Sequence, residues 1–178
     1  QITAIPYEQI TLADGTVPVR KPLSQIGGRL VAQISAHLLQ NDAQGKGLLL
    51  GGIAGVPPAE VVIIGAGVFG IYATRAFVGI GAHVTVLDVN YEALMRINDE
   101  MPNVVTMMSN AINIKRVTSF ADVVVAGILV PEERTPIVIT RDMVRAMKPG
   151  SLIMDLSIDE GGCVETSRPT SHEHPTYI

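Results

Sequence analysis

Three glycines and one acidic residue give this sequence its clearest chemical pattern. Gly65, Gly67 and Gly70 form a G-x-G-x-x-G motif directly after an apolar run, and Asp88 closes the next apolar run. The first glycine of such a motif permits a tight turn, the second lets a pyrophosphate approach the backbone, and the third lets a helix pack closely on a strand. Free N–H groups at the start of that helix can hold phosphate without a basic side chain. A purely structural turn is the alternative, but a place between strand and helix predicts a dinucleotide-binding site.

The position of Asp88 indicates which dinucleotide is bound. A carboxylate at the end of the second strand can accept hydrogen bonds from the adenosine ribose hydroxyls, and it repels a 2′-phosphate. No Lys or Arg that could neutralise such a phosphate occurs from Val89 to Met95. We therefore predict NAD rather than NADP as the cofactor. The alternative is that Asp88 only caps the following turn.

Two loops are predicted to lie at the same edge of the sheet as the glycine motif. Segment 127–131 follows the fourth predicted strand, and segment 157–163 follows the fifth. Ligands of open α/β sheets bind along the edge formed by the carboxyl ends of the strands. We expect backbone and apolar contacts to the nicotinamide side from the first loop, or else plain loop packing. In the second loop, Asp159 could meet the nicotinamide, its ribose or a substrate, or it could be a solvated acid.

The remaining reactive side chains favour no other chemistry. Cys163 is the one cysteine, and it is predicted to be a small buried residue rather than a nucleophile. His172-Glu173-His174 resembles a metal pair but has no evident third ligand, so no metal site is predicted. The sequence contains no Ser-His-Asp arrangement that we can identify.

The elements that position these residues predict an α/β fold, a Rossmann-type doubly wound parallel β-sheet with flanking helices. Strands are expected at 60–65, 83–88, 104–108, 122–126 and 151–155, and helices at 68–80, 92–98, 112–119 and 140–147. Asn90 and Thr140 are expected to cap their helices. Strands separated by helices require right-handed crossovers. We assign 51–178 to the dinucleotide-binding domain.

The first 50 residues are predicted to pack on that domain as an arm and a helix. Segment 1–21 reads as irregular, with Asp14-Gly15 as a turn in a short hairpin or arm. A helix is expected at 22–40, where Gly27 and Gly28 would let another element approach its backbone closely.

Composition limits the class of protein. The chain has 178 residues, 47% hydrophobic content and one cysteine, which favours a reducing cytoplasm. Its net charge is −4 and its 13 basic residues are scattered, so nucleic-acid binding has no support. The longest apolar run, between Glu60 and Arg75, is shorter than the roughly 20 residues of a membrane span. No signal peptide is visible, and no membrane association is expected.

Several motifs together resemble the alanine dehydrogenase family, whose wider group includes the NAD-binding subunit of proton-translocating nicotinamide nucleotide transhydrogenase. The resemblance covers nearly the whole chain. It rests on the segments at 51–59, 65–70, 84–90, 147–150, 158–163 and 165–170. The segment Asp159-Glu160-Gly161-Gly162-Cys163 favours the dehydrogenase side.

The resemblance implies NAD-dependent, reversible oxidative deamination of L-alanine to pyruvate and ammonia, in homo-oligomers that are usually hexamers. It implies that Ser24 reaches the cofactor phosphates, that Gly67, Val68 and Phe69 flank the pyrophosphate, and that Asp88 holds the ribose. It further places Ser109 near the adenine and Leu129 and Leu156 near the nicotinamide side. Asp159 corresponds to the family's active-site aspartate.

The resemblance also implies what this chain lacks. In the family, the pyruvate-binding Arg and Lys and the catalytic His lie upstream of the position of Gln1, so the chain reads as the nucleotide-binding part of a larger two-domain enzyme and is expected to be inactive alone. Ala93 stands where relatives often have Lys or Arg, and Pro131-Glu132-Glu133-Arg134 is more acidic than the usual pattern. Two alternatives stay open: the corresponding domain of a transhydrogenase alpha subunit, and a non-catalytic NAD-responsive interaction domain.

Overall fold

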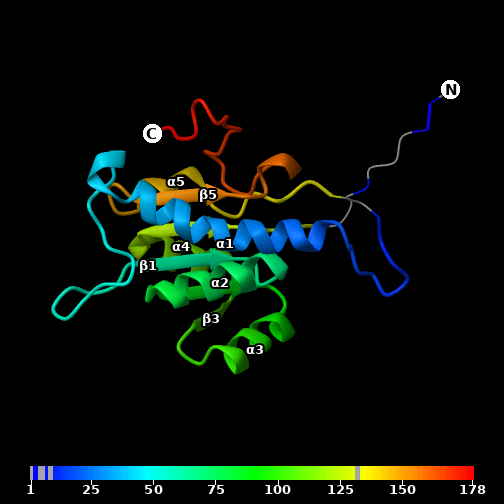
Figure 1. Ribbon diagram of the computed structural model, residues 1–178, viewed down its shortest axis with the longest axis horizontal. Coiled ribbons are helices and arrows are strands. Elements are labelled where there is room, and N and C mark those ends of the chain that lie inside the picture. The colour runs from blue at the N-terminus through cyan, green and yellow to red at the C-terminus, as the bar shows by residue number, and fades with distance from the viewer. Residues whose placement is uncertain (1, 4–6, 8–9, 131–132) are drawn as a thin grey trace.

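The computed structural model describes residues 2–3, 7, 10–130 and 133–178. One parallel sheet of five strands, in the order β3-β2-β1-β4-β5, forms its centre (Figure 1). The strands are β1 (Glu60–Ile64), β2 (His83–Asp88), β3 (Val105–Met108), β4 (Val123–Ala126) and β5 (Leu152–Asp155). The chain reverses its direction of strand addition between β1 and β4, which creates the switch point where such sheets bind ligands. The predicted Rossmann-type fold class is confirmed.

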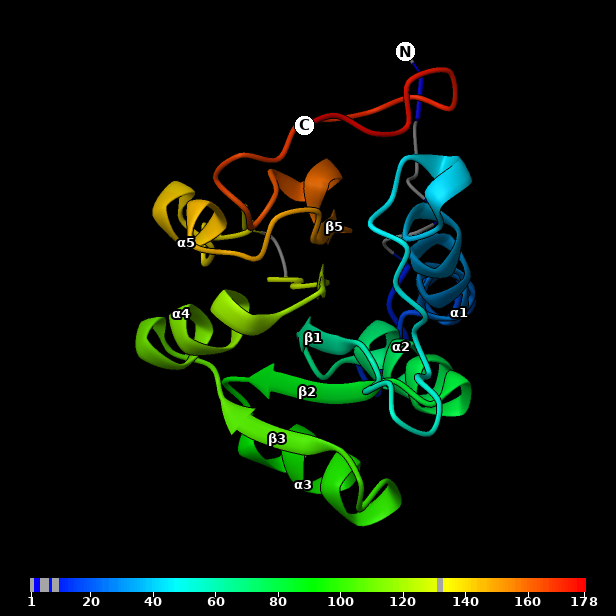
Figure 2. The ribbon, with the colours of Figure 1, turned by 90° about the vertical axis from the view of Figure 1, so that its left-hand side faces the viewer.

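Helices cover both faces of this sheet (Figure 2). They are α1 (Arg20–Leu38), α2 (Val68–Ile80), α3 (Tyr91–Glu100), α4 (Ala111–Phe120) and α5 (Arg141–Arg145), with short 3-10 turns η2 (Asn41–Ala43) and η3 (Ile158–Glu160). Every predicted strand and helix is present, with ends shifted by a few residues. The predicted caps are confirmed, because the Asn90 side chain accepts from Ala93 N at 3.2 Å and that of Thr140 from Met143 N at 3.3 Å.

Two buried clusters fill the space between sheet and helices. Val61 and Ile63 of β1 pack with α1, α2 and α3 on one face. Val62 and Ile64 pack with α4 and α5 on the other. All of β4 is buried, as expected for a β-branched run covered on both sides.

Helix α1 lies directly against α2, and a glycine permits this contact. A Cβ added to Gly28 would lie 2.6 Å from the carbonyl oxygen of Phe69 and 2.9 Å from Ala73 N. The close approach predicted from Gly27 and Gly28 is therefore confirmed at Gly28. It holds the third turn of α1 beside the start of α2.

The N-terminal segment turns at Asp14-Gly15 as predicted. Leu12 N donates to Thr16 O at 2.8 Å, and Thr16 N donates to the Asp14 side chain at 2.9 Å. No strand forms within residues 10–19, so this stretch is an arm rather than a paired hairpin. Of the segments predicted above, residues 1, 4–6, 8–9 and 131–132 lie outside the described residues. Among the helices of the described chain, none has the length and apolar character to cross a membrane.

An acidic residue ties together the amino edge of the sheet. The Asp122 carboxylate accepts hydrogen bonds from Lys46 Nζ at 2.7 Å, Lys148 Nζ at 3.2 Å and Glu60 N at 2.9 Å. Burial alone would raise the pKa of Asp122, but these three donors outweigh burial and lower it below its ordinary value. We call this group the Asp122 clamp. It joins the starts of β1 and β4 to the segments before β1 and β5.

Candidate functional site

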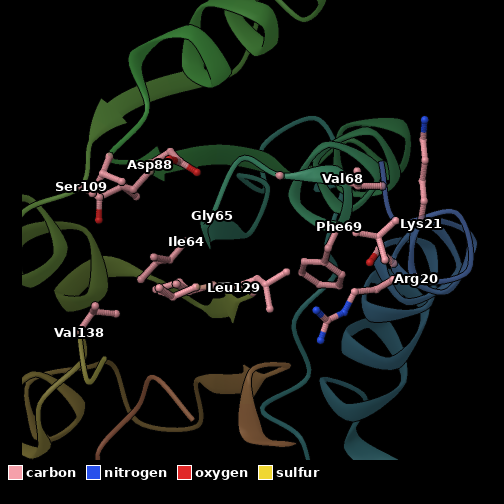
Figure 3. A pocket seen from close by; sticks show the side chains of 18 of the residues that line it. Arg20, Lys21, Ile64, Gly65, Val68, Phe69, Asp88, Ser109, Leu129 and Val138 are labelled. Atoms are coloured by element: carbon pink, nitrogen blue, oxygen red, sulfur yellow. The ribbon is translucent and has the colours of Figure 1, made fainter. Parts of the chain in front are cut away.

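A pocket of about 670 Å³ opens at the carboxyl edge of the sheet. Its walls come from the segment before α1, the first two turns of α1, the start of α2 and the segments that follow β1, β2, β3 and β4. Asp88 and Ser109 lie at one end, Arg20 and Lys21 at the other, and Phe69 between them (Figure 3). The pocket therefore sits at the switch point of the sheet, where the sequence predicts it.

Each glycine of the motif has a distinct structural setting. Gly65 has a φ of +109°, which favours glycine, and it turns the chain out of β1. A Cβ on Gly70 would overlap the carbonyl oxygen of Gly65, so α2 can pack there only without a side chain. Gly67 is the N-cap of α2, and a Cβ there would meet no protein atom within 4 Å. Of the three, Gly67 is thus the glycine whose missing side chain leaves open space.

The Asp88 carboxylate holds the glycine turn while it lines the pocket. Its Oδ2 accepts from Ala66 N at 2.5 Å, and its Oδ1 accepts from Asn90 N at 2.7 Å. A carboxylate has about four acceptor positions, so each oxygen retains capacity for a ligand hydroxyl. The backbone carbonyl of Asp88 accepts from Ser109 N at 2.8 Å, which brings Ser109 to the same end of the pocket.

An apolar wall runs along the middle of the pocket. Phe69 fills the space left by two glycines, because a Cβ on Gly27 would lie 3.6 Å from its ring and a Cβ on Gly127 would overlap that ring. Leu129, 48% exposed, lines the pocket after β4. Such a wall suits the flat faces of an aromatic ligand.

The first turn of α1 brings two cations to the pocket that sequence reasoning missed. Arg20, Lys21 and Ser24 all line it, and Arg20 Nη2 forms an ion pair with Glu160 Oε1. Two basic residues at the start of a helix follow no ligand-binding pattern. Only the close packing of α1 on α2 brings them to the glycine turn.

The loop after β5 is organised by a second carboxylate. Asp155 accepts hydrogen bonds from Ser157 N at 3.1 Å, Cys163 N at 2.9 Å and Val164 N at 3.1 Å. The Ser157 hydroxyl donates to Ile128 O and accepts from Ile128 N, both at 2.9 Å, which joins this loop to the one after β4. Asp159 stands exposed in η3 on this framework.

Cys163 is fully buried, as predicted. Burial and the nearby Asp155 carboxylate raise the pKa of its thiol to about 12, so it is not a thiolate at neutral pH. In the described part of the chain, no three His, Cys, Asp or Glu residues are arranged to hold a metal ion.

The structure brings most of the predicted site residues together. The following line the pocket: Ser24, Gly65, Gly67, Val68, Phe69, Asp88, Ser109 and Leu129. Three do not line it. Gly70 packs against the Gly65 carbonyl, Leu156 lies near Gly27 of α1, and Asp159 is in η3.

The arrangement fits a dinucleotide on two observations. Open space over Gly67 adjoins the first N–H groups of α2, which have no intrahelical acceptor and favour phosphate. Asp88 offers unused acceptor positions at one end of an apolar trough. The first feature suits the phosphates of a dinucleotide, and the second suits the hydroxyls of a ribose.

Comparison with known proteins gives consistent matches. The family described as "Alanine dehydrogenase/PNT, C-terminal domain" matches residues 31–178. An alanine dehydrogenase from Methanococcus maripaludis is 46% identical over 99% of this chain and 48% of its own length. A solved L-alanine dehydrogenase structure is 41% identical with a TM-score of 0.94, covering 98% of this chain and 48% of that one. A transhydrogenase from Sinorhizobium meliloti is 25% identical with a TM-score of 0.68, covering 84% and 43%. The chain thus spans about half the length of the curated relatives it matches.

Proposed function

The chain belongs to the alanine dehydrogenase/PNT family as an NAD(H)-binding domain, and on that premise we propose that the whole protein is an alanine dehydrogenase. The family and the cofactor predicted from the sequence are thereby confirmed. The proposed reaction converts L-alanine, NAD and water reversibly to pyruvate, ammonium, NADH and a proton. The alanine dehydrogenase names of relatives such as that of Methanococcus maripaludis support this assignment.

The glycine turn and α1 would bind the cofactor's phosphates. Backbone N–H groups of Gly67, Val68 and Phe69 stand where helix α2 begins, and the helix dipole favours negative charge there. The Ser24 hydroxyl would donate to a phosphate oxygen from the neighbouring helix. Gly65 and Gly70 would allow the tight turn and the close packing of α2, rather than contact the phosphates themselves.

Asp88 and Ser109 would bind the adenosine end. The free acceptor positions of Asp88 suit the two ribose hydroxyls, and its charge opposes a 2′-phosphate. Both cations of the pocket belong to α1, at the opposite end in Figure 3. This separation supports NAD over NADP.

The nicotinamide would lie near the loops after β4 and β5. When bound, NAD accepts the hydride that leaves the substrate carbon. Leu129 and Leu156 would shield the ring from water, and Asp159 would be the catalytic residue that contacts the nicotinamide side or the substrate. Asp155 would hold the Asp159 loop in place through its three backbone contacts.

Domain organisation, assembly and location complete the proposal. We propose that 51–178 is the dinucleotide-binding domain, on which 1–50 packs as an arm and a helix.

Exposed apolar side chains along α1, among them Leu23, Ile26, Leu30 and Ile34, support a homo-oligomer, with a hexamer as the proposed form. A single, buried, unpaired cysteine supports a cytoplasmic location.

The contact geometry of Asp88 carries the cofactor assignment and can be tested directly. Asp88→Asn keeps one acceptor oxygen, for either Ala66 N or Asn90 N, and removes the charge. NAD should therefore bind roughly tenfold more weakly, while discrimination against NADP should fall. Calorimetric titration of both nucleotides measures this. Unchanged NAD affinity in a variant that is still folded would remove Asp88 from the ribose site. Alanine-dependent formation of NADH by the whole protein tests the proposed reaction.

The likeness to the transhydrogenase structure supports a second candidate function. A transhydrogenase-type domain would exchange hydride with a second nucleotide-binding partner and would need neither alanine nor ammonium. Exchange between nucleotide analogues, in a whole protein that forms no NADH from alanine, would favour this candidate and reject the dehydrogenase.

A further inference from the structure

One ion pair links the pocket wall to the loop after β5. Arg20 belongs to the first turn of α1 and lines the pocket, while Glu160 belongs to η3, 140 residues further along the chain. Figure 3 shows the Arg20 guanidinium turned from α1 toward the lower edge of the pocket. We propose that this pair is a clasp that positions the Asp159 loop and slows the release of bound NAD(H). The release step rests on the cofactor site proposed above.

The Glu160 backbone is already held from two directions. Thr135 N donates to Glu160 O, and Glu160 N donates to Ser157 O, each at 2.9 Å. Ser157 in turn is bonded to Ile128 after β4. The Glu160 side chain thus adds a link to α1 from a turn that is already joined to the loop after β4.

Asp159 precedes Glu160 in the same short turn, so the clasp acts on it directly. On the other side of that turn, Arg134 packs against Gly161, where an added Cβ would overlap its guanidinium nitrogen Nε. Arg20 and Arg134, from different elements, therefore both contact the short turn that carries Asp159. Without Arg20, the turn would lose its side-chain link to α1 and keep only its contacts to the loops after β4 and β5.

The neighbouring cation Lys21 helps to distinguish a clasp from simple electrostatic attraction of the cofactor. It lines the same pocket one residue after Arg20, yet its ammonium makes no ion pair within the described chain. An anionic cofactor is attracted by either cation and repelled by Glu160. Charge attraction alone therefore predicts that removing Arg20 weakens binding and that removing Glu160 strengthens it. A clasp predicts that both changes speed release.

The test is stopped-flow release of NADH from the 178-residue chain, followed by the fluorescence of NADH during displacement by excess NAD. Both side chains of the pair are about a third exposed, which corresponds to a modest coupling. Arg20→Gln and Glu160→Gln should each release NADH roughly two- to fivefold faster. Arg20→Lys should restore much of the slow release, and so should the exchange Arg20→Glu with Glu160→Arg. High salt should reduce the difference between variants.

Hydrogen exchange without nucleotide gives a second readout. Arg20→Gln should increase exchange of the amides at 160–162, which bond to Ser157 and Ile158, whereas Lys21→Gln should leave that exchange unchanged. Opposite effects of Arg20→Gln and Glu160→Gln on release, or equal exchange in wild type and Arg20→Gln, would overturn the clasp. If the wild-type chain binds no NADH, the proposed function fails, and hydrogen exchange still decides whether the pair orders the loop.

Discussion

Adding one methyl group at Gly67 should separate cofactor binding from folding. A Cβ there would meet no protein atom within 4 Å, and the φ of −71° is accessible to alanine. Because alanine is a poorer N-cap residue than glycine, Gly67→Ala should lower the free energy of unfolding by about 1 kcal/mol. The same methyl would occupy the space through which a pyrophosphate reaches the N–H groups of α2. Overpacking of this kind costs about 1–3 kcal/mol, which is roughly five- to 150-fold in NAD affinity.

Urea unfolding and calorimetric titration of NAD would measure the two effects on one variant. Gly70→Ala is the matched control, because its Cβ would overlap Gly65 O within the protein itself. That control should lose stability by several kcal/mol, in the upper range for single substitutions. The reasoning would be refuted if Gly67→Ala bound NAD as tightly as the wild type, or if it lost as much stability as Gly70→Ala.

Three further predictions concern the Asp122 clamp, the contact between α1 and α2, and the loop that carries Asp159. Asp122→Asn should lower the free energy of unfolding by about 2 kcal/mol at neutral pH. Because the folded-state pKa of Asp122 is lowered, this contribution is present above the ordinary value of 3.8 and is lost below it, so urea curves of wild type and variant should converge in acid. Gly28→Ala should cost about 1–3 kcal/mol by crowding Phe69 and α2, seen as a lower thermal midpoint. Asp159→Asn, tested in the whole protein, should depress alanine turnover far more than NAD affinity; equal kinetics would return Asp159 to the role of a loop acid.

The strands and helices could be predicted because each is specified locally. The β-branched residues of β4 indicate a doubly covered strand, and side-chain acceptors at Asn90 and Thr140 mark the starts of their helices. The glycine turn could be predicted for the same reason, because the spacing of its glycines reflects steric requirements within one short segment. Local sequence therefore located the binding edge of the sheet.

Contacts between distant segments could not be predicted in the same way. Arg20 and Glu160 are separated by 140 residues, and neither residue type nor spacing marks them as partners. Asp155 appears in the sequence only as the end of a strand, yet its carboxylate organises the loop that carries Asp159. Such contacts depend on how α1 and β5 are brought together, which the tertiary fold determines.

The Asp122 clamp lies at the end of the sheet opposite the pocket, which has a practical consequence for engineering. Strands of four to six residues rise by about 3.3 Å per residue, so roughly 15 Å of rigid sheet separates the clamp from the glycine turn. Mutational libraries directed at the clamp and its lysines could therefore be screened for heat tolerance alone, with little disturbance of nucleotide preference. Libraries directed at the carboxyl edge could be screened for a changed cofactor on a scaffold stabilised beforehand.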